Sequence, residues 1–446
     1  MPPLAKGHTM TAPTYAEFLA RKQRTATPVG PDITTDDVHP MLHDWQAELV
    51  RWACHTGRAA VWADTGLGKT FVAAEWARLS GETTLTVAPL AVCQQTIREA
   101  AKLGSTMRYI RDGVIPGPGM WITNYEQVHK FDPDQIDAVV LDEASILKNS
   151  DGKTRRMLIE HFARVPRRLA CTATPAPNDP EELCNQAEFL GRSTRVNMLA
   201  AYFVHDDQGW RLKGHARRPM FTWMASWAVA LRRPSDLGYP DDGYILPGLE
   251  IVSELIPVEL EAEGQLFATD LGGVGGRARV RRDTLAARCG RVLDLVAAEP
   301  DEPWLLWCGL NDEASTLARL IPGAVNVGGS MTPEQKADAL LGFADGDIRV
   351  LVTKPSIASQ GLNYQHCARM AFVGLSDSYE QYYQAIRRCY RYGQTRVVRA
   401  HVVLSELESQ IAANVARKET EASAMTAELV TAMRTASTIP ALELTR

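Results

Sequence analysis

Short apolar runs alternate with longer mixed stretches along the chain from residue 42 onward. The runs are rich in β-branched residues, are bounded by turn-forming residues and are too short for helices. They lie at residues 59–63, 84–88, 121–124, 138–142 and 169–172. Stretches such as 70–79 and 91–103 lie between them and have the composition of helices. Buried strands that alternate with helices are typical of βαβ units on a parallel sheet, so this part predicts an α/β lobe.

A second series of apolar runs predicts a second α/β lobe. Its strands are expected at residues 304–308, 325–327, 349–353, 370–374 and 398–404. Residues 234–257, between the two series, contain four prolines and several glycines. That is the composition of a hinge or a crossing connection.

Both ends of the chain differ from the two lobes. Residues 1–40 hold six prolines around one candidate helix at 15–24, which predicts an arm rather than a packed core. Residues 406–434 are rich in Ala, Glu, Met and Arg and lack Gly and Pro, which favours one or two closing helices. The predicted division is an arm over 1–40, a first lobe over 41–240, a connection over 241–257, a second lobe over 258–405 and a helical tail over 406–446.

Composition agrees with a folded protein of this size. A length of 446 residues accommodates two or three packed cores. Hydrophobic residues make up 45% and charged residues 23%, which excludes a disordered chain, a collagen-like rod and a coiled coil. The formal net charge of -5 and the pI of about 6.1 argue against a nucleic-acid partner unless basic residues are clustered.

Cysteine spacing and apolar segments bear on the compartment. The eight cysteines form no Cys-x-x-Cys pair, so neither a zinc ribbon nor a disulfide framework is indicated, and most are expected to be small buried side chains. The first residues lack the apolar run of a secretory signal. The most apolar stretch, 221–231, is about half the length needed to cross a bilayer and predicts a core helix. These features favour a reducing, cytoplasmic setting, with no membrane partner.

The first predicted strand continues into a glycine-rich turn, Gly66-Leu67-Gly68-Lys69-Thr70, and then into a predicted helix. Glycines allow backbone N–H groups to wrap around phosphates, and the following helix N-terminus adds positive potential. Lys69 would place its charge on the β and γ oxygens, and Thr70 would offer its hydroxyl to Mg²⁺. The alternative is a glycine-rich surface turn, which the flanking strand and helix disfavour.

Two adjacent acids, Asp142 and Glu143, end the predicted strand at 138–142. Asp142 is expected to hold Mg²⁺, and Glu143 is expected to act as the general base for an attacking water. Two acids at the end of a strand more often form a solvated turn. Their position downstream of the phosphate loop, on the same predicted sheet, favours the catalytic interpretation.

The order of these blocks resembles the superfamily-two nucleic-acid motors, specifically the Swi/Snf branch of DNA-dependent ATPases, from about residue 42 to residue 404. The matching segments of the first lobe are LHDWQ (42–46), ADTGLGKT (63–70, motif I), TLTVAPLAVCQQ (84–95), ITNYEQV (122–128), LDEASILKN (141–149, motif II) and CTATPAPNDPEEL (171–183, motif III). The phosphate loop begins with Ala63 where the strict pattern has Gly, as in helicase-type motors. The resemblance implies that Gln46 bonds the adenine edge and that Thr65 contacts the nucleotide together with the loop glycines.

Two segments of the second lobe extend the resemblance. TKPSIASQGLNYQ (353–365) resembles motif V, and QAIRRCYRYGQ (384–394) resembles motif VI. This implies that Gly361 belongs to the nucleotide site and that Arg388 and Arg391 reach the γ-phosphate across the cleft between the lobes. The alternative for these arginines is a basic helix face in water. The segments GLNYQHC and LSDSYEQYYQAIRR resemble the compact Swi/Snf-type proteins of bacteriophages, which implies the cytoplasm of a bacterial or phage-infected cell.

Three positions depart from the family pattern. Motif II ends in Ser145 rather than His, and motif VI has Arg387 where Gly is usual and Tyr390 where His is common. In the family the histidines couple hydrolysis to DNA contact, so the departures bear on coupling and not on the magnesium and arginine roles.

Basic residues are unevenly distributed along the chain. They concentrate at residues 153–168, 210–218, 277–291 and 387–399. Such clusters can bind phosphates despite a negative total charge, because salt screens distant acids, and they are candidates for a DNA-binding surface. The alternative for each is a solvated helix face. Trp223 and Trp227, at helical spacing, are expected in the core.

The resemblance implies an α/β fold of two tandem RecA-like lobes with parallel sheets, an ATP cleft between them and a helical C-terminal tail. The function it implies is an ATP-dependent DNA translocase or helicase-like motor that uses ATP and Mg²⁺ and contacts the backbone of DNA, preferentially duplex, independently of sequence. Alternatives are a true strand-separating helicase, a DNA-binding scaffold with weak ATPase activity, and a P-loop enzyme that acts on a small molecule.

Overall fold

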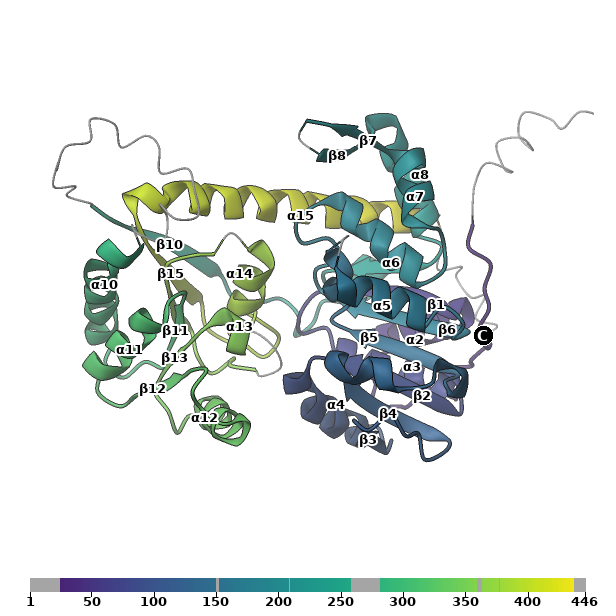
Figure 1. The fold of residues 1–446 in the computed structure, drawn as a ribbon, viewed down its shortest axis with the longest axis horizontal. Helices are drawn as coiled ribbons and strands as arrows, with labels where there is room; N and C mark the ends of the chain where they lie inside the picture. The colour runs from purple at the N-terminus through teal and green to yellow at the C-terminus, as the bar shows by residue number, and fades with distance from the viewer. Residues whose placement is uncertain are drawn as a thin grey trace, which may run out of the picture.

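The computed structural model describes residues 25–149, 152–207, 209–257, 281–358, 363–376 and 378–436. Within these ranges the chain forms two α/β lobes, each with its own parallel sheet, and one long helix that runs across both (Figure 1). Most of the expected arm, the candidate helix at 15–24 and Gly361 lie outside the described residues.

The first lobe is built on a seven-stranded parallel sheet in the order β3-β4-β2-β5-β6-β1-β9. Its strands are β1 (Arg58–Ala63), β2 (Thr83–Ala88), β3 (Met107–Tyr109), β4 (Gly119–Asn124), β5 (Ala138–Asp142), β6 (Arg167–Thr172) and β9 (Ala228–Leu231). Its helices are α2 (Asp44–Thr56), α3 (Lys69–Ser80), α4 (Leu90–Lys102), α5 (Lys153–His161), α6 (Leu183–Phe189), α7 (Arg195–Tyr202) and α8 (Gly214–Met224). The strands predicted from the first series of apolar runs are confirmed.

This sheet is buried on both faces. Along β1, Ala60 and Trp62 belong to one apolar core, whereas Ala59, Val61 and Ala63 belong to the core on the other face. Successive side chains of a strand point to opposite faces, so a run that is apolar at every position requires cover on both sides. Because the strands are parallel, β1, β5 and β6 all end at the same edge of the sheet.

The second lobe is built on a six-stranded parallel sheet in the order β10-β15-β14-β11-β13-β12. Its strands are β10 (Leu249–Ile256), β11 (Trp304–Cys308), β12 (Ala324–Val327), β13 (Val350–Thr353), β14 (Arg369–Val373) and β15 (Val398–Ser405). Its helices are α10 (Leu285–Ala298), α11 (Asn311–Leu320), α12 (Pro333–Asp345), α13 (Pro355–Ala358) and α14 (Tyr379–Ile386). The strands predicted from the second series are confirmed.

Two segments differ from the prediction. The expected connection over 241–257 contains β10, which pairs along its whole length with β15 and forms the edge of the second sheet. The apolar stretch 221–231 is not one core helix, because α8 ends at Met224 and the remainder turns into β9 beside β1. Trp223 and Trp227 are both buried, as expected, with ring centroids 5.4 Å apart.

A β-hairpin that the sequence did not predict joins α7 and α8. It consists of the antiparallel strands β7 (Phe203–Asp206) and β8 (Gly209–Leu212). Figure 1 shows it projecting from the first lobe near one end of the long helix.

The tail forms a single helix, α15 (Ser409–Ala436), of 28 residues. Its first half contributes Ile411 and Val415 to a core of the second lobe, and its second half contributes Met425 and Leu429 to a core of the first lobe. The helix is therefore shared by both cores. Among the described helices, none is both long and apolar enough to span a membrane. All eight cysteines are described and are buried, as predicted for most of them.

Candidate nucleotide site between the lobes

The predicted phosphate loop connects β1 to α3. Gly66 and Gly68 both adopt left-handed backbone conformations, with φ of 87° and 72°. A Cβ on Gly68 would lie 2.5 Å from Gln46 Nε2, and one on Gly66 would lie 2.9 Å from the backbone nitrogen of Tyr392. The two glycines are thus required by conformation and by close approach, and they leave the loop backbone open to a ligand.

Lys69 begins α3 and folds back over the loop. Its Nζ donates to the carbonyl oxygens of Ala63 at 2.7 Å and Asp64 at 3.1 Å. Burial lowers the pKa of the Lys69 ammonium, and the carboxylates of Glu143, Asp64 and Asp142 oppose this shift. The charge is held where a bound phosphate would replace the carbonyls as its partner.

Asp142 ends β5 and faces the same cleft. Burial, together with the adjacent Glu143 carboxylate, raises the pKa of Asp142 to about 7. The Tyr125 hydroxyl donates to the Asp142 carbonyl oxygen at 2.6 Å and fixes the end of the strand. A carboxylate that is costly to ionise here is favoured in its charged form by a bound cation.

Glu143 has a backbone φ of 64° and is the one non-glycine residue in the described chain with a positive value. A long side chain in this conformation costs about 1–3 kcal/mol, and such strain concentrates at functional sites. Glu143 Oε1 accepts hydrogen bonds from Thr172 Oγ1 at 2.7 Å and from Ser145 Oγ at 2.9 Å. The Ser145 hydroxyl and the Thr172 hydroxyl of motif III therefore orient the candidate base together. Ser145 stands where the family has His.

The second lobe supplies the opposite wall of the cleft. Arg388 and Arg391, which follow α14, line it together with Asn363, Gln365 and Tyr392. Burial lowers the pKa of Arg391 to about 10, with Arg388 adding to the shift, and burial also lowers the pKa of Arg388. The cleft has a volume of about 310 Å³.

Most predicted site residues come together in this cleft. Those that line it are Thr65, Gly66, Gly68, Lys69, Thr70, Asp142, Glu143, Arg388 and Arg391. The loop glycines and three cationic side chains match a triphosphate, and the Thr70 hydroxyl and Asp142 carboxylate are the hard oxygen donors that Mg²⁺ prefers. The residues present thus fit ATP with Mg²⁺.

Gln46 supports the loop from behind. Its side chain is buried, Nε2 donates to Leu67 O at 3.1 Å, and Oε1 accepts from the His43 N–H at 3.0 Å. Both ends of the amide are thus bonded within the protein, and Gln46 is not among the residues that line the cleft. Its role in reading the base stays a prediction, as does that of Gly361.

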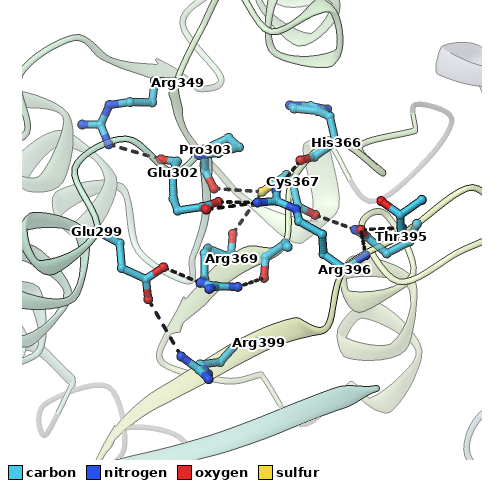
Figure 2. A network of polar contacts seen from close by, with 12 residues as sticks. Glu299, Glu302, Pro303, Arg349, His366, Cys367, Arg369, Thr395, Arg396 and Arg399 are labelled. Carbon is cyan, nitrogen blue, oxygen red and sulfur yellow. Dashed lines mark hydrogen bonds and ion pairs between the residues drawn. The ribbon is translucent and has the colours of Figure 1, made fainter. Parts of the chain in front are cut away.

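The arginines of the basic run at 387–399 face the cleft or form ion pairs. Arg388 and Arg391 face the cleft, and Arg387 pairs with Asp64. Figure 2 shows the remaining two arginines in an ion-pair network of the second lobe, where Arg396 lies 2.8 Å from Glu302 and Arg399 lies near Glu299. Arg399 also pairs with Glu250 at 2.9 Å.

Several arginines of the other basic runs also form ion pairs or hydrogen bonds to backbone carbonyls. Within 277–291, Arg281, Arg288 and Arg291 pair with Glu408, Glu313 and Glu254. Within 210–218, Arg211 and Arg217 pair with Asp206 and Glu428, and within 153–168, Arg155 pairs with Glu188 and Arg168 is buried against backbone carbonyls. The role of these runs in DNA binding stays a prediction.

Comparison with protein families gives one match in each lobe. Residues 38–197 match the SNF2-related domain, and residues 290–393 match the helicase conserved C-terminal domain. A comparison with curated proteins gives no match. The first match contains the phosphate loop and both acids, and the second contains Arg388 and Arg391. Since the two domains occur in this order on two parallel-sheet lobes that share a nucleotide cleft, the chain belongs to the Snf2-type helicase-like proteins of superfamily two.

Proposed function

We propose that this protein hydrolyses ATP to move along duplex DNA without fully separating the strands. One observation carries the proposal: Lys69 and Glu143 from the first lobe and Arg388 and Arg391 from the second line a single cleft. A site completed by both lobes is active only in one relative arrangement of the lobes. Hydrolysis is thereby linked to their relative movement, which is what a motor requires.

Each group of side chains in the cleft has its own role in the proposed hydrolysis. Gly66, Gly68 and Lys69 would hold the phosphates, and Thr70 and Asp142 would hold Mg²⁺, which neutralises phosphate charge when bound. Glu143 is positioned to take a proton from the attacking water. Arg388 and Arg391 would stabilise the charge that spreads over the transferring phosphoryl group.

Motif III offers a route for coupling. Thr172 Oγ1 donates to Glu143 and accepts from the Thr174 N–H at 3.1 Å. In related motors this segment links the nucleotide site to the DNA groove. A shift of the motif III backbone would therefore move the carboxylate of Glu143, the candidate general base. The hydroxyls of Thr172 and Ser145 would take the place of the family histidine.

Three alternatives remain distinct from this proposal. A strand-separating helicase would use the same cleft, whereas a DNA-binding scaffold would have little use for a complete set of catalytic residues. A P-loop enzyme acting on a small molecule would need no second lobe with two arginines in the cleft. The likeness to compact bacteriophage proteins stays a prediction.

The deciding experiment measures phosphate release with duplex DNA, single-stranded DNA, RNA or no nucleic acid. We expect the highest rate with duplex DNA, and we expect Glu143→Gln to lower kcat by about 10²–10⁴-fold while still binding ATP. Equal rates under all four conditions contradict the motor, and the absence of hydrolysis by either protein supports the scaffold.

A second assay separates translocation from unwinding. Displacement of a third strand from a triplex reports movement along intact duplex, and release of one strand from a forked duplex reports separation. We expect the first without the second. Release from the fork at a comparable rate supports the helicase alternative.

A further inference from the structure

Arg387 crosses from the second lobe to the phosphate loop of the first. Its Nη2 lies 2.9 Å from Asp64 Oδ2, and the hydroxyl of Tyr383 donates to the other oxygen of the same carboxylate. The guanidinium lies 5.1 Å from the ring centroid of Tyr383 and 5.3 Å from that of Tyr390. With side-chain exposures of 18% for Arg387 and 15% for Asp64, this ion pair is shielded from solvent, which strengthens it.

Asp64 is tightly connected to the nucleotide loop. Its N–H donates to Leu231 O at 2.9 Å, and its carbonyl oxygen accepts from Lys69 Nζ at 3.1 Å. Its Oδ1 also accepts from the Thr65 N–H at 2.6 Å. A displacement of Asp64 would therefore shift the loop backbone and the partner of the phosphate-binding lysine.

The other end of α14 is attached to the first lobe as well. Glu380, in its first turn, pairs with Lys148, which follows the two acids of motif II. Arg387 directly follows the last residue of α14 and directly precedes Arg388. One short helix is thus held against motif I at one end and motif II at the other, next to an arginine of the cleft.

The contact depends on a residue that departs from the family pattern. Where Gly is usual, no side chain could reach Asp64. Arg388 and the turn from Cys389 to Arg391 directly follow Arg387. The position of the Arg387 backbone therefore determines where the segment that carries both cleft arginines begins. The other arginines of this segment that point away from the cleft pair within the second lobe instead.

We propose that Asp64, Tyr383 and Arg387 form an interlobe clamp that positions Arg388 and Arg391 over the cleft before DNA binds. This inference rests on the proposed ATPase function. Arg387 acts as a positioning residue, since its partner is the loop and not the nucleotide. In the protein without DNA, the clamp already holds the lobes in part of the closed arrangement that DNA binding would otherwise have to produce.

The test compares Arg387→Gln and Asp64→Asn with wild type. Because a misplaced catalytic group costs as much as about 10²-fold, we expect kcat without DNA to fall about tenfold or more. Saturating duplex DNA should restore part of the rate, so the ratio of stimulated to basal kcat rises, while affinity for a non-hydrolysable ATP analogue stays within about threefold. The double variant should lose no more basal kcat than the worse single variant, since both changes remove the same Arg387–Asp64 ion pair.

Arg396→Gln is the matched control. Arg396 belongs to the same basic run and forms an ion pair with Glu302, but its side chain is 42% exposed and is not among the described residues that line the cleft. Arg396→Gln should retain the wild-type ratio of DNA-stimulated to basal kcat. An unchanged ratio in both Arg387→Gln and Asp64→Asn, or additive losses in the double variant, overturns the clamp. If Arg387→Gln does not fold, Tyr383→Phe removes one bond to Asp64 and should raise the ratio to a smaller degree.

A structural readout separates the clamp from the ATPase proposal. Ala101 on α4 and Ala337 on α12 are exposed, one in each lobe, and dyes on cysteines placed there report lobe separation because the native cysteines are buried. Transfer efficiency without nucleotide should fall in Arg387→Gln and Asp64→Asn but not in Arg396→Gln. Unchanged efficiency in the first two overturns the clamp even if wild type hydrolyses no ATP.

Discussion

The hydroxyl of Thr172 matters because of what it holds. It bonds Glu143 Oε1 at 2.7 Å from the end of β6 and so defines where the candidate base points. Thr172→Val keeps the shape and removes the donor, so we expect kcat to fall about tenfold to hundredfold with little change in the ATP dissociation constant.

Thr84→Val provides the control for this prediction. Thr84 is buried on β2 of the same sheet, and its hydroxyl has no hydrogen-bond partner among the residues that the structure describes. It should retain wild-type kcat. Equal losses in the two variants would show that the effect of Thr172→Val comes from the fold of the sheet and not from the base.

Asp142 makes stability depend on pH. Its pKa is raised to about 7, so between the ordinary carboxyl value and pH 7 the folded state binds more protons than the unfolded state, and stability falls as pH rises. Asp142→Asn removes this cost. We expect its free energy of unfolding to exceed that of wild type by about 1–3 kcal/mol at pH 8 and the difference to vanish near pH 4, as measured by urea unfolding.

A difference for Asp142→Asn that stays constant with pH contradicts the assignment. Asp142→Asn should also lose Mg²⁺-dependent hydrolysis, which would separate stability from activity at this residue.

Residues whose role depends on local order could be predicted from the sequence. Gly66, Gly68 and Lys69 follow a strand and open a helix, and that context is visible in the chain itself. The roles of Ser145 and Arg387 could not be predicted, because each depends on a partner that the fold brings close. Only their departure from the family pattern marked them.

At the scale of elements, one buried ion pair joins two helices of the second lobe. Arg288 on α10 and Glu313 on α11 are 0% and 1% exposed and lie 2.6 Å apart. Arg288→Met would leave the Glu313 charge buried without its partner, so we expect a loss of about 3–5 kcal/mol in denaturant unfolding.

Arg291→Met tests whether burial is the cause. Arg291 lies one turn later on α10, pairs with Glu254 and is 39% exposed. Its replacement should cost less than about 1 kcal/mol. Comparable losses for the two arginines would contradict the distinction.

The strands were predictable because a run that is apolar at every position fits a sheet covered on both faces. β10 was not, because it is an edge strand with alternating exposure and lies among prolines that suggest a connection. The division of 221–231 between α8 and β9 also escaped prediction, since apolarity alone does not distinguish a short buried strand from the end of a helix.

At the scale of the whole molecule, α15 joins the two cores. Leu429 is fully buried in the first lobe, whereas Ile411 is buried in the second. We expect wild type to unfold in one calorimetric transition and Leu429→Asp to unfold in two, because a buried unpaired charge releases the helix from the first lobe only.

Glu421→Ala is the control on the same helix. Glu421 is exposed and pairs with Arg417 one turn earlier, so its replacement should leave a single transition. A single transition for Leu429→Asp as well would show that the lobes are coupled by other contacts.

The shared helix also restricts how the lobes can move. A helix of 28 residues is about 42 Å long and bends little. While both halves remain packed, it is a rigid element with one lobe attached to each half. The lobes can then swivel around its axis but cannot draw apart along it. Closure of the nucleotide cleft would then be a rotation of one lobe against the other around this helix.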